Sequence, residues 1–257
     1  MARLIGHPGS TVLAQYAAAV VYYHLGDRGA ASLNAKAASN LGRAHGVMGW
    51  PAHASIILAR LLVDEGRIDE AIHIAEENLP ASMCAGWPWG ASISFGLVAD
   101  IYARAGQPAK GLHMLKSLEP KHYEGLYGPE IYRLHGNLLL DGSLQATDEA
   151  EMHLRKATTL ARERQMKSLE LRAAISLAYF LAPRDRRRAR AVLSVVDDFS
   201  KGSEFAKLSA IKSRCLGSRK ECPDSAWGER FMAPDRFWLS FTVGAFAVLI
   251  GLAAFLV

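Results

Sequence analysis

The amino-acid sequence predicts an all-α protein: an α-solenoid of about five antiparallel helix pairs, followed by one C-terminal transmembrane helix. Three observations support this fold class. Short turns recur about every 40 residues, the segments between them have the apolar periodicity of helices, and residues 237–257 contain no charged side chain. Runs of β-branched residues, which are typical of strands, are scarce.

Five turns divide the first 200 residues into helix pairs. Gly26, Gly66 and Gly106 are each 40 residues apart, and two further turns follow at 140–143 and 181–184. Glycine adopts the left-handed conformation of a tight helix–helix turn without steric cost. A near-constant period of this length is typical of repeat architectures.

The segments beside these turns predict about ten helices between residues 11 and 196. In the second pair, apolar stripes at 57–62 and 68–75 face each other. Small residues between pairs allow close approach of the helices: Ala71, Gly111, Ala150 and Ala189.

The first helix carries an apolar stripe that no earlier pair covers. Its members are Leu13, Tyr16, Val20 and Tyr23. An open apolar face at the end of a repeat array requires a cover. We therefore expect a second copy of the chain or a partner protein to pack there.

This pattern resembles tetratricopeptide-type helical repeats, as in the small–large spacing of residues 66–71, although the usual period is about 34 residues. A more specific resemblance is to the helical-repeat region of large bacterial signalling ATPases, and it is carried by residues 131–140, 150–157 and 167–178. These ATPases often carry a nucleotide-cyclase or transcriptional-regulator module. The resemblance covers roughly residues 6–213 and implies a helical-repeat fold. No Gly-x-x-x-x-Gly-Lys-Ser/Thr motif occurs, and nothing corresponds to the family's ATPase or cyclase domain.

We expect three regions along the chain. A helical-repeat domain spans 1–200, a juxtamembrane linker with one short helix spans 201–236, and a transmembrane helix spans 237–257. At about 1.5 Å per residue, this last helix reaches roughly 31 Å, against a hydrocarbon core of about 30 Å. Twelve of its residues are Leu, Ile, Val or Phe, and they contribute about −4 to −7 kcal/mol to membrane insertion. A buried core helix of a soluble fold is the alternative.

Residues at the start of this helix predict its orientation. Trp238 suits the membrane–water interface, and Arg236 ends a basic flank that places the helical repeats in the cytoplasm. One face of the helix carries only small residues, at Gly244, Ala247, Gly251 and Ala254. This face predicts packing against another membrane helix; ordinary Gly and Ala content is the alternative.

The net charge of +5 is mildly basic and suits an anionic membrane surface or an acidic partner. The densest basic run is a candidate for contact with lipid headgroups or an acidic protein, with a solvated helix face as the alternative; it contains Arg184, Arg186, Arg187, Arg188 and Arg190. No aromatic platform or nucleic-acid module accompanies it, so we expect no nucleic-acid partner.

The sequence shows no convincing catalytic, cofactor-binding or metal-binding set. Cys84, Cys215 and Cys222 are too sparse for a disulfide framework and wrongly spaced for zinc, so we expect reduced thiols. Trp50 and the Trp87-Pro88-Trp89 segment precede helix starts. We expect them to seal junctions between repeats, with exposed anchors for a bound peptide as the alternative.

These observations favour a non-enzymatic, membrane-tethered scaffold or adaptor that binds proteins through its repeat surface. Three alternatives stay open. The chain is an accessory subunit of a larger membrane complex, or a regulatory region that acts in trans on a signalling ATPase or cyclase, or a remnant of a longer gene. The sequence does not decide between a monomer and a homo-oligomer.

Overall fold

The structure is a computed structural model that describes residues 7–24, 26–83, 88–120, 123, 125–142 and 147–199. These residues contain ten helices and no strand, which confirms the predicted all-α class. The chain divides into two compact units, one with helices α2 to α7 and the other with helices α9 to α12.

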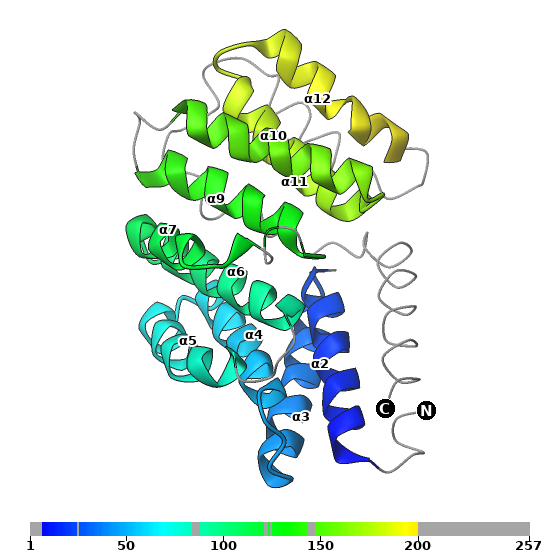
Figure 1. Ribbon diagram of the computed structural model, residues 1–257, viewed down its shortest axis with the longest axis vertical. Helices are drawn as coiled ribbons and strands as arrows, with labels where there is room; N and C mark the ends of the chain where they lie inside the picture. The colour runs from blue at the N-terminus through cyan, green and yellow to red at the C-terminus, as the bar shows by residue number, and fades with distance from the viewer. Residues whose placement is uncertain are drawn as a thin grey trace. The chain divides into compact units, whose positions relative to one another are not determined.

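The first unit contains three antiparallel helix pairs (Figure 1). Their bounds are α2 (Pro8–His24) with α3 (Arg28–Ala44), α4 (Trp50–Asp64) with α5 (Ile68–Met83), and α6 (Pro88–Arg104) with α7 (Pro108–Lys116). Both helices of one pair pack against the first helix of the next: α2 and α3 contact α4, and α4 and α5 contact α6. Each pair is thus covered by its neighbour along the chain.

The second unit repeats this order with two pairs. α9 (Gly128–Gly142) pairs with α10 (Thr147–Glu163), and α11 (Lys167–Leu181) pairs with α12 (Arg186–Phe199). Both α9 and α10 contact α11, and Figure 1 shows the members of each pair lying side by side. Stacking against the next pair in sequence is the packing rule of repeat proteins.

The predicted glycine turns are confirmed. Gly26, Gly66 and Gly106 have φ angles of 75°, 80° and 71°, which lie in the left-handed region. After α4, the N–H of Gly66 donates to the carbonyl of Val63, and the N–H of Arg67 donates to the carbonyl of Leu62. This pair of bonds is a Schellman motif, which satisfies the last carbonyls of the helix.

Small side chains allow the paired helices to approach closely. Four residues predicted to lie between pairs are all buried: Ala71, Gly111, Ala150 and Ala189. At Gly136 on α9, a Cβ atom would lie 2.8 Å from Leu154 Cγ and 3.0 Å from the carbonyl oxygen of Ala150 on α10. A larger residue at this position would therefore push α9 and α10 apart.

The expectation of an open apolar face on the first helix is wrong for two of its residues. The exposed fractions of Tyr16 and Val20 are 0% and 1%. They are covered because α2 packs against α4 as well as against α3, and the Tyr16 ring lies 5.5 Å from that of Trp50 on α4. Leu13 and Tyr23 are half-buried.

The predicted linker at 201–236 and the predicted transmembrane helix at 237–257 lie outside the described residues. Among the helices that the structure describes, none combines the length and the apolar character that crossing a bilayer requires.

Candidate functional site

Several predicted site residues lie outside the described part of the chain. They are the candidate membrane-packing face and the candidate interface anchors: Gly244, Ala247, Gly251, Ala254, Trp238 and Arg236. The three cysteines and Trp87 lie outside it too. Trp50 is described and buried, and its ring lies 5.5 Å from the rings of Tyr16 and His53. Trp50 therefore seals the junction between the first two pairs, as the sequence predicted.

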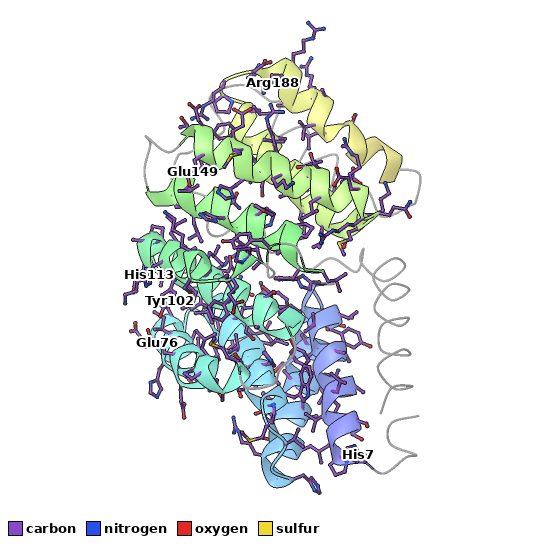
Figure 2. The ribbon with its side chains drawn as sticks, viewed as in Figure 1. His7, Glu76, Tyr102, His113, Glu149 and Arg188 are labelled. Atoms are coloured by element: carbon purple, nitrogen blue, oxygen red, sulfur yellow. The ribbon has the colours of Figure 1, made fainter. Side chains whose placement is uncertain are left out.

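All five arginines of the predicted basic run are exposed. Asp185 lies directly before α12, and its carboxylate accepts a hydrogen bond of 3.0 Å from the N–H of Arg188. This carboxylate offsets the basic charge that the sequence places at a helix N-terminus. Arg188, labelled in Figure 2, also donates to Glu151 on α10 at 2.7 Å. The guanidinium of Arg184 lies 4.2 Å from the centre of the Phe180 ring. Part of this run therefore contacts the neighbouring helices α10 and α11.

A buried ionic network joins the second and third pairs. The Arg60 side chain on α4 is fully buried, and it donates to Asp64 at 2.9 Å and to Asp100 on α6 at 2.5 Å. Arg28 on α3 reaches Asp64 at 3.1 Å, and Arg104 reaches Asp100 at 3.2 Å. A buried guanidinium requires such partners because an unpaired buried charge is strongly destabilising.

A second polar contact between α4 and α6 lies at His53. The His53 side chain is fully buried, and its Nδ1 atom lies 2.6 Å from Ser94 Oγ on α6. Gly90 leaves room for the ring, because a Cβ atom there would lie 2.9 Å from His53 Nε2. Burial lowers the pKa of His53 to about 4, so the ring is neutral at physiological pH.

The His53–Ser94 pair has the residue types of a nucleophile and its base, but no substrate reaches it. The exposed fractions of His53 and Ser94 are 0% and 1%. A general base must come within hydrogen-bonding distance of the substrate proton that it abstracts. The pair therefore positions the two helices relative to each other.

The second unit contains a comparable buried cluster around Glu130 on α9. The Glu130 carboxylate accepts hydrogen bonds from Arg133 at 2.7 Å and from Arg172 on α11 at 2.6 Å. Arg133 also donates to Ser176 at 3.4 Å. Burial alone would raise the pKa of Glu130, but the charges and hydrogen bonds of Arg133 and Arg172 hold it well below its usual range.

Four of these contacts share one feature: each joins the first helix of a pair to the first helix of the next pair. The partners are separated by 40 residues at Arg60–Asp100, 41 at His53–Ser94, 42 at Glu130–Arg172 and 43 at Arg133–Ser176. They fix the register between successive pairs. Sequence reasoning did not find them, although polar residues separated by about one repeat period were the available signal.

A different cluster lies between the two helices of one pair. Three residues each offer one metal-ligand atom, and these atoms all lie within 4.8 Å of one another. They are His135 on α9 and Glu149 and His153 on α10. The two rings stack with centroids 4.0 Å apart. Glu149, labelled in Figure 2, has an Oε1 atom 3.9 Å from His153 Nε2. The sequence analysis expected no metal-binding set; the four-residue spacing of Glu149 and His153 was visible in it, but the position of His135 was not.

Neither a protein-family model nor a curated protein matches the chain. The resemblance to tetratricopeptide repeats and to bacterial signalling ATPases therefore stays a prediction from the residues that suggested it.

Proposed function

We propose that this protein is a membrane-tethered scaffold that binds another protein through its helix pairs. The observation that carries the proposal is the stacking of successive pairs in one order, with buried polar contacts between their first helices. Within each unit, the pairs pack on their neighbours along the chain, so each unit offers an outer surface built from several helices. Proteins of this architecture typically bind partners along such a surface. We further propose that the five pairs belong to one tetratricopeptide-like α-solenoid.

In the second and fourth pairs, the second helix is the better candidate for partner contact. α4 buries 12 of its 15 residues and α5 buries 3 of its 16, whereas α9 buries 10 of its 15 and α10 buries 5 of its 17. The buried residues of α10 form one stripe, and the rest of its surface is accessible. A partner therefore meets mainly the second helices and the turns.

Among the residues that the structure describes, four large apolar side chains are exposed. They are Leu33 on α3, Met48 in the turn after α3, Met83 at the end of α5 and Met152 on α10, with exposed fractions of 58% to 72%. Methionine is common on adaptable protein-binding surfaces. Single exposed apolar residues are also normal on any protein, so we use these four as positions for probes.

The proposed tether is the uncharged segment at 237–257. Its apolar residues favour insertion by about 4 to 7 kcal/mol, and the upstream basic residues favour a cytoplasmic location for the helix pairs. We propose a non-enzymatic role, because the sequence shows no convincing catalytic set and the buried His53–Ser94 pair is sealed from substrate.

Site-specific photocrosslinking in cells tests the binding role. A photoreactive amino acid is placed at Leu33, Met83 or Met152, and a control chain carries it at the fully buried position Tyr16. We expect discrete adducts heavier than the chain from at least one exposed position and none from the control. If all three exposed positions yield no discrete adduct in membrane-bound chains, the proposed binding role is wrong.

A second candidate is an accessory subunit that docks on a membrane complex through its terminal helix. The face of small residues at Gly244, Ala247, Gly251 and Ala254 favours it, because such faces allow close packing of membrane helices. Exchange of residues 237–257 for an unrelated apolar anchor separates the two candidates. Adducts from Met152 that persist after the exchange support a scaffold with a passive tether, and adducts that disappear support docking through the helix.

A further inference from the structure

We propose that His135, Glu149 and His153 bind a divalent transition-metal ion, most typically Zn²⁺, between α9 and α10. The three residues offer two imidazole nitrogens and one carboxylate oxygen within 4.8 Å of one another. Two histidines and one glutamate form an established donor set for zinc, and imidazole also suits copper, iron and nickel. The proposal goes beyond the partner-binding role and does not depend on it.

The local fold brings these three residues together. Glu149 and His153 are four residues apart on α10, so their side chains lie on one face of the helix. His135 faces them from α9, with its ring stacked on that of His153. Gly136, the next residue of α9, makes this approach possible because it has no side chain to contact Leu154. The cluster therefore depends on the closest contact between two rigid helices.

The distances fit binding after a small movement of the side chains. Zinc ligands lie about 2.0 to 2.2 Å from the ion, which places tetrahedral ligand atoms roughly 3.3 to 3.6 Å apart. The separations here are 3.9 Å for Glu149 Oε1 to His153 Nε2 and at most 4.8 Å for the others. Each imidazole binds a metal in the plane of its ring, so the stacked rings must splay apart. The half-exposed Glu149 side chain has room to rotate toward the ion, whereas the two buried rings must turn within the contact between α9 and α10.

The burial of the three residues defines what the site would do. The His135 residue and the His153 side chain have exposed fractions of 5% and 12%, whereas the Glu149 side chain has one of 48%. An ion would enter past Glu149, and water would complete its coordination there. Because its ligands come from both helices, the bound ion would hold α9 and α10 together and stabilise the fold by an amount that grows with the logarithm of its concentration above the Kd.

Titration of the full-length chain with Zn²⁺ in detergent micelles tests the proposal, with binding measured by calorimetry and folding by thermal unfolding. The test variants are Glu149→Ala, His153→Gln and His135→Phe, which retains a ring for stacking. The matched control is His73→Gln on α5, because His73 and Asp69 have the same four-residue spacing and are both exposed. All of these chains retain the three cysteines, so differences between them report on the cluster.

We expect one Zn²⁺ per chain at this site, with a rise in the unfolding temperature, in both the wild type and the His73→Gln control. Each test variant should weaken this binding by about 10-fold or more, the loss that even an outer-shell partner of a metal site causes. If His135→Phe does not fold, the exposed position Glu149 decides the test. The proposal would be overturned if Glu149→Ala and His153→Gln bound Zn²⁺ as tightly as the wild type. It would also be overturned if His73→Gln lost as much Zn²⁺ affinity as the test variants.

Discussion

At the scale of single residues, this fold depends on polar groups that are buried together with their partners. Glu130 is 2% exposed and meets two arginines, whereas Arg60 is fully buried and meets two aspartates. A buried ion pair adds little stability over an apolar pair, but the loss of one partner leaves an uncompensated charge. These residues therefore determine which helices lie next to each other.

Replacement of Glu130 by glutamine tests this role. Glu130→Gln removes the carboxylate and leaves the guanidinium of Arg133 without its charged partner in a buried site. We expect a loss of about 3 to 5 kcal/mol in the free energy of unfolding. Urea unfolding of the full-length chain in micelles, followed by circular dichroism, measures it. Glu163→Gln, at the exposed end of α10, is the control and should cost under about 0.5 kcal/mol. Equal costs for both variants would contradict the role of Glu130.

His53 predicts a dependence of stability on pH. Its pKa falls from 6.5 in the unfolded chain to about 4 in the fold, so only the unfolded chain gains its proton between these values. The stabilisation is therefore complete above pH 6.5 and decreases as the pH falls toward 4. The loss amounts to about 3 kcal/mol over this interval. The free energy of urea unfolding at several pH values between 4 and 8 measures it.

The variant that removes this titration is His53→Gln, which keeps a polar group for Ser94. Its stability should decrease less steeply below pH 6.5 than that of the wild type, while the exposed control His73→Gln should follow the wild-type curve. If His53→Gln has the same pH dependence as the wild type, the burial of a neutral His53 is not the cause.

At the scale of the elements, the helix ends show how local chemistry fixes the repeats. Gly26, Gly66 and Gly106 all end helices in the left-handed conformation. After α10, Gln165 occupies the corresponding position with a φ of 56°. The N–H groups of Gln165 and Met166 make the two Schellman hydrogen bonds, to Arg162 and Ala161. A residue with a side chain is strained in this conformation, by about 1 to 2 kcal/mol.

Replacement of Gln165 by glycine should therefore stabilise the second unit. We expect Gln165→Gly to raise the free energy of unfolding by about 0.5 to 1 kcal/mol, since glycine relieves the strain but has more freedom in the unfolded chain. Thermal unfolding measures this gain. At Gln107, where φ is −116°, the same replacement relieves no strain and should be neutral or destabilising. A loss of stability in Gln165→Gly would contradict the account of this turn.

The features that the sequence predicted correctly are local ones. The turns at Gly26, Gly66 and Gly106 follow from the conformational freedom of glycine, and the helices follow from apolar periodicity. The polar contacts between pairs were missed because they depend on which residues of α4 face α6, and which of α9 face α11. The metal cluster was missed for the same reason: Glu149 and His153 share one helix, but His135 lies on another.

The wrong prediction for the first helix has a similar cause. A single apolar stripe on α2 was expected to leave Tyr16 and Val20 exposed, yet both are buried, and α2 has a second neighbour, α4, whose Trp50 meets Tyr16. The periodicity of one helix shows how wide its apolar face is, but it does not show how many neighbours pack on that face.

At the scale of the whole molecule, we propose that the helix pairs bind a partner and that residues 237–257 hold them at a membrane. Residues 237–257 contain 12 Leu, Ile, Val or Phe residues and no charge. Their apolar character favours membrane insertion by about 4 to 7 kcal/mol. Each arginine at the centre of a bilayer costs about 2.5 to 3.5 kcal/mol, so two central arginines are sufficient to cancel this insertion free energy.

The most direct test of this account is flotation of the full-length chain with cell membranes after alkaline extraction. The wild type and an exposed control, Leu33→Arg, should float with the membranes, whereas the double variant Ala247→Arg, Val248→Arg should be released. Circular dichroism of all three chains verifies that the helices are intact. A wild-type chain that leaves the membranes without detergent, in the same fraction as the double variant, would contradict the account.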